Sequence, residues 1–375
     1  MKTSFLINWL FIAILILSPA CNTQEPAEEG LKDALEGKFI FGTAMNEPMI
    51  NGTDTASLNI LHKHFNSVVA ENCMKSGLIQ PIEGEFDFVL PDKFIAFAEQ
   101  NGLYTVGHCL IWHSQAPHWL FVDEEGNDIG REILIERMKT HIFTVVKRYK
   151  GKVDCWDVVN EAIEDDGSWR NNKFYQILGE EYVELAFKFT QEADPDAELI
   201  YNDYSMFHEG RREGVVKLVN NLKSKGLRVD GIGMQAHSGM DYPPLDEFEK
   251  SIIAFVETGA EVHVTEMDIT ALPFPDRRVG AEVSASFEYQ QIMNPYANGL
   301  TDSARVALKD RYLDFFELFL KHEDKIKRVT MWGITDQQSW RNYWPIRGRN
   351  DFPLLFDREY SAKPIVEDII KAAKK

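Results

Sequence analysis

Two glutamates in this sequence directly follow short apolar segments and are candidates for joint chemistry. Glu161 follows the apolar segment 153–159, and Glu266 follows the segment 261–265. Either carboxylate alone could simply cap the next helix. A pair of carboxyl groups that flank a glycosidic bond can hydrolyse it, because one protonates the leaving oxygen while the other attacks the sugar or activates water. The presence of both glutamates, with Asn160 just before the first, favours catalysis.

Further polar and aromatic side chains follow the other apolar segments of the chain. Amides, histidines and carboxylates can hydrogen-bond hydroxyl groups, and aromatic rings can stack on the apolar face of a sugar. One such residue after one strand would mean little, but their recurrence is hard to explain by packing alone. The residues are Glu71, Asn72, His108, Trp112, Gln115, Asn202, Tyr204, Gln235, His237, Asp268, Trp332 and Trp340.

The elements that must position these residues alternate between apolar segments and helical patterns. Strands that are buried on both faces appear as continuous apolar runs. The predicted strands are Phe39–Thr43, Ser67–Ala70, Leu103–Leu110, Val153–Val159, Ala197–Tyr201, Gly231–Gln235, Glu261–Thr265 and Val329–Ile334. The predicted helices include Leu90–Gln100, Ile133–Tyr149, Glu180–Ala193, Arg211–Lys225, Leu245–Glu257 and Ala304–His322.

This alternation predicts an α/β fold, and specifically a (β/α)8 TIM barrel. The carboxyl ends of all barrel strands converge on one face, where active sites are built, and strands 4 and 7 carry the two glutamates to opposite sides of it. A doubly wound open sheet is the alternative. No GxGxxG or P-loop motif follows the first strand, which disfavours a nucleotide-binding version of that alternative.

Length and composition limit the classes of partner. The chain of 375 residues has room for two or three small domains or one large barrel, and no Pro/Gly/Ser-rich linker interrupts it after Lys38. Its formal net charge of −19 disfavours nucleic acid and anionic membrane surfaces as partners, because like charges repel. A neutral polysaccharide is compatible with this charge. Oligomeric state stays open.

The N-terminus has the pattern of an export signal. A positive start and an apolar run at 5–17 are followed by Ala20 and Cys21. We predict a signal peptide at 1–20, a flexible acidic tether at 21–37 and a catalytic domain at 38–375. Small residues before Cys21 favour lipidation of this cysteine and an outer-membrane lipoprotein facing the cell surface or periplasm. Ordinary secretion after cleavage is the alternative, so contact with a membrane would depend on this lipid anchor.

The remaining cysteines predict neither a disulfide framework nor a metal site. Cys109 and Cys155 lie inside apolar strand-like segments. If Cys21 is acylated, these two and Cys73 remain, and an odd number leaves at least one cysteine unpaired. Buried free thiols are the simplest interpretation. No CxxC or His/Cys cluster with metal spacing occurs, so neither a metal nor an organic cofactor is implied.

The sequence resembles glycoside hydrolase family 10, the retaining endo-β-1,4-xylanases, over roughly Lys38 to Ala373. The resemblance depends on eight motifs that occur in the family's order. They are FGTA at 41–44, ENCMK at 71–75, GHCLIWHSQ at 107–115, WDVVNEA at 156–162, NDY at 202–204, GMQAH at 233–237, TEMDI at 265–269, and WGITD at 332–336 with SWR at 339–341.

The resemblance implies a role for each matching residue. Glu161 would be the general acid/base and Glu266 the nucleophile. His237, Asp268, Gln235 and Asn160 would support them, with Asn160 binding the sugar 2-hydroxyl. Tyr204 would stack a sugar on the leaving-group side, and Asn202 would lie near the acid/base. The sugars on the non-reducing side would contact Glu71, Asn72, Lys75, His108, Trp112, Gln115, Trp332 and Trp340.

The expected function is therefore endo-acting hydrolysis of xylan with net retention, and the expected partners are xylan and xylooligosaccharides. Two alternatives stay open at this point. The first is a β-1,4-glucanase with the same mechanism, since one fold serves many polysaccharides. The second is a glycan-binding lipoprotein that captures xylan without cutting it, although a binding protein would not need both Glu161 and Glu266.

Overall fold

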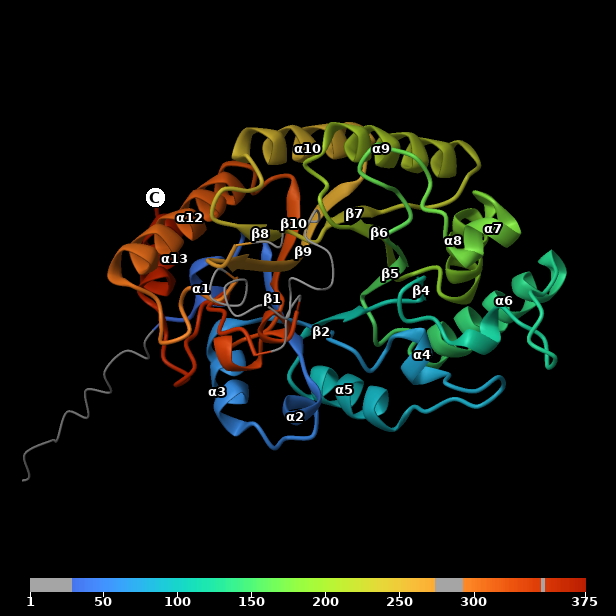
Figure 1. Ribbon diagram of the computed structural model, residues 1–375, viewed down its shortest axis with the longest axis horizontal. Helices are drawn as coiled ribbons and strands as arrows, with labels where there is room; N and C mark the ends of the chain where they lie inside the picture. The colour runs from blue at the N-terminus through green and yellow to red at the C-terminus, as the bar shows by residue number, and fades with distance from the viewer. Residues whose placement is uncertain (1–28, 274–292, 345–347) are drawn as a thin grey trace, which may run out of the picture.

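The computed structural model describes residues 29–273, 293–344 and 348–375, and these form a closed parallel barrel surrounded by helices (Figure 1). The predicted signal peptide and Cys21 lie outside the described residues. Eight strands close the barrel in the order β10-β1-β2-β3-β5-β6-β7-β9, and β9 pairs with β10. The predicted (β/α)8 fold is confirmed, and the open-sheet alternative is wrong.

Ten strands are present in the described residues, and two of them are short extensions of the barrel. β4 pairs with β5, and β8 pairs with β9, beyond the ring itself. The strands are β1 (Ile40–Met45), β2 (Ser67–Ala70), β3 (Tyr104–Gly107), β4 (Ile111–Trp112), β5 (Cys155–Asn160), β6 (Glu198–Asp203), β7 (Gly231–Met234), β8 (His237–Gly239), β9 (Glu261–Thr270) and β10 (Ile326–Met331).

Helices cover the outside of the barrel, and the six predicted ones are confirmed as α5, α6, α8, α9, α10 and α12. α10 has the predicted bounds, and the other five differ from theirs by one or two residues at one or both ends. Polar caps define several starts, such as Thr301, whose hydroxyl accepts from the Ala304 N–H at 3.2 Å. The α-helices are α1 (Leu31–Ala34), α2 (Glu47–Ile50), α3 (Thr55–His64), α4 (Ser76–Ile79), α5 (Val89–Gln100), α6 (Arg131–Arg148), α7 (Lys173–Leu178), α8 (Glu181–Ala193), α9 (Glu209–Ser224), α10 (Leu245–Glu257), α12 (Asp302–Lys321) and α13 (Pro364–Ala373). The 3-10 turns are η1 (His118–Leu120), η3 (Asp336–Gln338) and η4 (Trp340–Asn342).

The barrel interior is densely packed, and one tryptophan occupies much of the space between β3 and β5. Trp156 on β5 is 1 % exposed and belongs to the hydrophobic core. A side chain at Gly107 on β3 would approach the Trp156 ring to 2.3 Å, which explains why only glycine fits there. Cys109 and Cys155 are buried free thiols, as predicted, and Cys73 is also buried and free.

The predicted tether reaches too far into the chain. Residues 31–34 form α1, and Leu31 and Leu35 are fully buried in the main hydrophobic core. α1 packs against α3 and α13, so this segment is part of the folded barrel. The predicted end of the tether at residue 37 is therefore wrong. So short a helix with two buried leucines produces no long periodic pattern, so hydrophobic periodicity could not predict α1.

The strand that carries Glu266 is longer than predicted, and its additional residues include Glu266 and Asp268. β9 continues to Thr270 instead of ending at Thr265. Glu266 and Asp268 therefore belong to one strand and point to the same side, because side chains alternate along a strand with a period of two. The eighth predicted strand is displaced in the other direction, since β10 ends at Met331.

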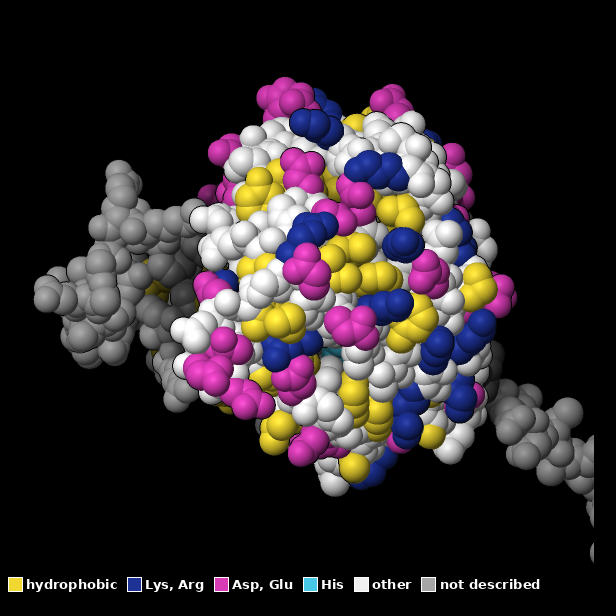
Figure 2. All heavy atoms as spheres, turned by 90° about the vertical axis from the view of Figure 1, so that its right-hand side faces the viewer, with side chains coloured by type: hydrophobic (Ala, Val, Ile, Leu, Met, Phe, Trp, Pro, Cys, Tyr) yellow, Lys and Arg dark blue, Asp and Glu magenta, His cyan; other side chains and the backbone are white. Residues whose placement is uncertain are grey.

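The surface combines acidic and basic side chains despite the net charge. Figure 2 shows the face around α6 and α7, where lysines and arginines lie among aspartates and glutamates. Lys173, for example, lies 2.7 Å from Asp128 there. Such exposed pairs contribute little stability. None of the helices in the described ranges is long and apolar enough to cross a membrane.

The burial of α1 leads to a prediction about stability. We expect Leu31→Ala to lower the free energy of unfolding by about 2–5 kcal/mol, because it leaves a cavity at a fully buried position. Urea unfolding followed by circular dichroism measures this change. Leu78→Ala is the control, because Leu78 is 51 % exposed. Equal stability of the two variants would show that α1 does not belong to the cooperatively folded unit.

Candidate active site

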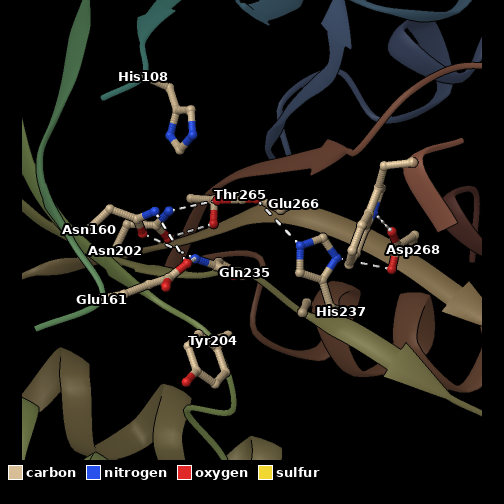
Figure 3. A network of polar contacts seen from close by, with 12 residues as sticks. His108, Asn160, Glu161, Asn202, Tyr204, Gln235, His237, Thr265, Glu266 and Asp268 are labelled. Atoms are coloured by element: carbon tan, nitrogen blue, oxygen red, sulfur yellow. Dashed lines mark hydrogen bonds and ion pairs between the residues drawn. The ribbon is translucent and has the colours of Figure 1, made fainter. Parts of the chain in front are cut away.

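Glu161 lies just after β5, where the barrel strands bring polar side chains to one face (Figure 3). Its Oε1 accepts hydrogen bonds from Gln235 Nε2 at 3.1 Å and from Asn160 Nδ2 at 3.4 Å. Gln235 Nε2 also donates to Asn160 Oδ1 at 3.0 Å. The two amides and the carboxyl group thus form a closed cluster that holds the side chain of Glu161 in place.

The backbone at the ends of β5 and β7 is strained. Glu161 has a φ of 61°, and Ala236, between β7 and β8, has a φ of 60°. Non-glycine residues in this left-handed region cost of order 1–3 kcal/mol and persist only where their surroundings fix them. The Glu161 N–H donates to the Asn202 carbonyl at 2.9 Å, which is one such constraint. The strain therefore lies next to the polar cluster, where the strands direct side chains into the site.

Glu266 lies on β9 and is only 5 % exposed. Its Oε1 accepts a hydrogen bond from Asn202 Nδ2 at 2.8 Å, and its Oε2 lies 3.4 Å from His237 Nε2. Burial acts to raise the pKa of Glu266. The hydrogen bonds from His237 and Asn202 and the electrostatic influence of His108 outweigh burial and hold this pKa below its ordinary value. Glu266 is therefore ionised near neutral pH.

His237 lies between Glu266 and Asp268, as Figure 3 shows. The parallel register of β8 and β9 pairs His237 with Asp268, and His237 Nδ1 lies 3.0 Å from Asp268 Oδ1. Asp268 also accepts hydrogen bonds from Arg341 Nε and Trp340 Nε1, each at 2.8 Å. Arg341, Asp268, His237 and Glu266 thus form a row whose charges alternate in sign.

The row explains two large pKa shifts. Burial acts to lower the pKa of His237, but the carboxylates of Asp268 and Glu266 outweigh it and raise this pKa to about 9. Burial acts to raise the pKa of Asp268, but the charges of Arg341 and His237 outweigh it and lower this pKa to about 2. His237 is therefore a cation and Asp268 an anion over the whole neutral range.

Asp157 on β5 connects His108 to Asn202. Its Oδ2 lies 2.8 Å from His108 Nδ1 and accepts from Asn202 Nδ2 at 3.1 Å. Thr265 Oγ1 donates to Asn202 Oδ1 at 2.7 Å. Burial raises the pKa of Asp157 against the opposing hydrogen bond from His108. The side-chain amide of Asn202 is thus held at both ends, and its nitrogen faces the carboxyl groups of Asp157 and Glu266.

Aromatic and polar side chains continue from this centre toward one side of the site. The His108 ring centroid lies 5.3 Å from that of Trp332 and 6.4 Å from that of Trp112. Lys75 Nζ lies 5.1 Å from the Trp112 centroid and donates to Asn72 Oδ1 at 2.9 Å. These residues come from the ends of four different strands, so together they form a continuous wall.

Glu71 and Gln115 belong to the same side. Burial raises the pKa of Glu71, and the positive charge of Lys75 opposes this rise. The carbonyl of Gln115 accepts from the Gly77 N–H at 2.9 Å, which holds the loop after β4 against α4. A side chain at Gly77 would approach that carbonyl to 2.5 Å, so the close contact requires glycine.

Tyr204 lies on the other side of Glu161, apart from the central cluster (Figure 3). The guanidinium of the buried Arg211 lies 4.1 Å from the Tyr204 ring centroid. Arg170 Nη2 donates to the Tyr204 hydroxyl at 2.7 Å. Two arginines thus fix the ring from behind and at its edge, and we expect its remaining surface to be available to a ligand.

Two groups of side chains in the described residues are compact enough to hold a metal ion. One is His108, Asp157 and Glu266, and the other is Glu198, Glu261 and His263. The first group already shares hydrogen bonds with Asn202. In the second, Lys327 lies 3.3 Å from Glu198 and 3.4 Å from Glu261 and supplies a positive charge. In both groups, protein side chains therefore already contact the carboxylates.

The structure brings most of the predicted site residues together. Around the two glutamates it places Asn160, Asn202, Gln235, His237, Asp268, His108, Trp332 and Trp340. Glu71, Asn72, Lys75, Trp112 and Gln115 lie on one side and Tyr204 on the other. The sequence analysis missed Asp157, Thr265, Arg341 and Arg170. Each lies within or near a quoted motif, but its partner comes from a distant element.

Comparisons with known proteins agree with this geometry. The sequence pattern described as "Glycosyl hydrolase family 10" matches residues 30–372. The chain is 50 % identical over 341 residues to "Endo-1,4-beta-xylanase A" of Xylanibacter ruminicola, covering 91 % of this chain and 92 % of the relative. It is 40 % identical over 340 residues to "Endo-1,4-beta-xylanase" of Geobacillus stearothermophilus, covering 89 % and 96 %.

A solved structure agrees as well. A GH10 endoxylanase retrieved from a sugarcane soil metagenome superposes with a TM-score of 0.86 at 40 % identity, and the match covers 92 % of this chain and all of that one. The family match extends over nearly the whole described barrel, including both glutamates and the row that ends at Arg341. The chain therefore belongs to glycosyl hydrolase family 10.

Proposed function

We propose that this chain hydrolyses internal β-1,4-xylosidic bonds of xylan with net retention of configuration, through a covalent glycosyl-enzyme intermediate. Membership of glycosyl hydrolase family 10 and the names of its relatives support xylan as the substrate. The observation that carries the mechanism is the contrast between two glutamates in one cluster. Glu266 is the last member of a row of alternating charges, whereas Glu161 accepts hydrogen bonds from neutral amides.

In the first step Glu266 acts as the nucleophile and Glu161 as the general acid. The ionised carboxylate of Glu266 attacks the anomeric carbon while Glu161 transfers its proton to the leaving oxygen, so the glycosidic bond breaks as the ester bond forms. His237 and Asn202 orient the carboxylate of Glu266 for this attack. Retaining enzymes hold the two carboxyl groups about 5–5.5 Å apart to allow this direct displacement.

In the second step Glu161 acts as the general base. Formation of the ester removes the negative charge of Glu266, which makes ionisation of Glu161 easier. Glu161 then takes a proton from water, the oxygen of that water attacks the anomeric carbon, and Glu266 leaves as a carboxylate. Two inversions of configuration give net retention. We also propose that Asn160 binds the sugar 2-hydroxyl, where the interaction strengthens in the transition state.

The side chains around the glutamates support binding of a chain of sugars. We propose that Glu71, Asn72 and Lys75, with His108 and Gln115, hydrogen-bond the sugars on the non-reducing side. Trp112, Trp332 and Trp340 would form the walls against which the sugar rings pack. Tyr204 would stack against the first sugar of the leaving group, since it lies beyond Glu161.

We further propose that the protein is exported and that Cys21 carries a lipid anchor. The charged start, the apolar run at 5–17 and the small residues before Cys21 support this proposal. The anchored form would belong to the outer membrane, facing the cell surface or the periplasm. Without acylation the same signal would lead to secretion.

A product profile tests the proposed function. We expect purified protein lacking residues 1–21 to release short xylooligosaccharides from glucuronoxylan and arabinoxylan, and nothing from soluble β-glucan. Chromatography identifies the released oligosaccharides and their lengths, and proton NMR of the first products should show the β-anomer. Cleavage of β-glucan alone would make the chain a glucanase. Binding of xylan without cleavage would support a glycan-binding protein instead.

The nucleophile assignment predicts a loss of turnover without a loss of binding. Glu266→Ala should lower the rate of xylan hydrolysis by several orders of magnitude, because no group remains to form the glycosyl-enzyme. Xylooligosaccharide binding, measured by calorimetry, should persist. Glu181→Ala is the control, since Glu181 lies on α8 and is 43 % exposed. Substantial residual activity of the Glu266 variant would remove this residue from the role.

The row of charges predicts a shift in the pH profile. Asp268→Asn should lower the pKa of His237 from about 9, so that its hold on the ionised Glu266 weakens. The pKa of Glu266 should then rise, and the acidic limb of kcat/KM should move to higher pH, because a protonated Glu266 cannot attack. Asp246→Asn, at an exposed position, serves as the control. An acidic limb at the same pH as in the wild type would show that Asp268 does not influence the pKa of Glu266.

A further inference from the structure

Arg170 uses all three nitrogens of its guanidinium on different groups around Glu161. Its Nε donates to the Glu161 carbonyl at 2.9 Å, and its Nη2 donates to the Tyr204 hydroxyl at 2.7 Å. Its Nη1 lies 3.2 Å from Glu164 Oε1, and the side chain is 16 % exposed. Arginine presents donors in several fixed directions of one plane, whereas the single ammonium of lysine cannot meet three separated acceptors.

The loop after β5 explains why Arg170 returns to Glu161 nine residues further along the chain. Ile163 and Trp169 form an antiparallel bridge, and the Arg170 N–H donates to the Ala162 carbonyl at 2.8 Å. The loop is therefore folded back on itself as a short hairpin. This arrangement places the base of the Arg170 side chain beside the main chain of Glu161.

The contact with the Glu161 carbonyl lies at a strained position. Glu161 has left-handed backbone geometry, which needs constraints from its surroundings. On its N-terminal side the Glu161 N–H is held by the Asn202 carbonyl at 2.9 Å. On its C-terminal side the Glu161 carbonyl is held by Arg170. The direction in which the Glu161 side chain leaves the backbone thus depends on Asn202 and Arg170 together.

The contact with Tyr204 links the same guanidinium to the leaving-group side. Arg211 fixes the main chain of Tyr204 by donating from Nη1 to its carbonyl at 2.6 Å, and packs against one face of its ring. Arg170 fixes the outer end of the ring at the hydroxyl. Because this hydroxyl accepts from Arg170, its own proton is free to point elsewhere. A movement of Arg170 would therefore shift both Glu161 and Tyr204.

We propose that Arg170 is a positioning residue that couples proton donation by Glu161 to the binding of the leaving group by Tyr204. A sugar stacked on Tyr204 and the proton donor for its oxygen are aligned through one rigid guanidinium. The inference rests on the proposed role of Glu161 as acid/base and extends it to a residue outside the reacting groups. Misplacement of a catalytic group by about 1 Å can cost about 10²-fold in rate.

Substrates that differ in their need for protonation test this proposal. Xylotetraose has a poor leaving group that requires the proton of Glu161 and occupies the subsite at Tyr204. A xylobioside of 2,4-dinitrophenol has a leaving group that departs without protonation. We expect Arg170→Gln to lower kcat/KM for xylotetraose by about 10²-fold, as general acid catalysis of this size would imply, and to affect the activated substrate much less. Arg170→Lys should not restore the wild-type ratio.

Arg137→Gln is the matched control. Arg137 also binds a carboxylate, that of Glu83, and two main-chain carbonyls, those of Trp119 and Val122. Its side chain is 14 % exposed. It should leave the ratio of the two substrates unchanged. An equal loss of both activities in Arg170→Gln, or no loss of either, would overturn the inference, and thermal unfolding would identify a general loss of folding.

Glu161→Ala separates this inference from the proposed function. The Glu161 variant should show the same leaving-group dependence in an exaggerated form. If Glu161→Ala treats both substrates alike, then the acid/base assignment itself fails. If Glu161→Ala shows the dependence and Arg170→Gln does not, then only the role of Arg170 is wrong.

Discussion

Two chemically identical side chains lie in one polar cluster but in unlike surroundings, and the proposed mechanism depends on this contrast. Glu266 is stabilised as an anion because His237 is kept cationic by Asp268, which in turn is kept anionic by Arg341. Glu161 belongs to a different environment, in which the amides of Asn160 and Gln235 supply hydrogen bonds without charge. The contrast in surroundings, and not in residue type, distinguishes the two proposed roles.

The register of the barrel makes this separation possible. Asn202 on β6 accepts from the main chain of Glu161 and donates from its side chain to the carboxylate of Glu266, so one residue contacts both glutamates. The Gln235 carbonyl accepts from the Glu266 N–H at 3.0 Å, while its side chain holds Glu161. Parallel strands in fixed register can provide such double contacts because neighbouring main chains and side chains alternate regularly.

Much of the fold and the two glutamates could be predicted because each depends on local pattern. Apolar runs followed by polar residues identify strand ends, and Glu161 and Glu266 are the carboxylates that follow two of them. Arg341 and Asp157 could not be found this way, since their importance comes from partners 45 or more positions away. The burial of α1 was missed for a similar reason, because α1 packs against the distant helix α13.

The packing of α1 against α13 also brings the two ends of the described fold together. Glu29, before α1, forms an ion pair with Lys374, just after α13, so the two ends of the described fold lie side by side. α1 leads into the start of β1, whereas the site is built at the carboxyl ends of the strands. Both ends of the described fold therefore lie on the side of the barrel opposite the residues that we propose to bind xylan.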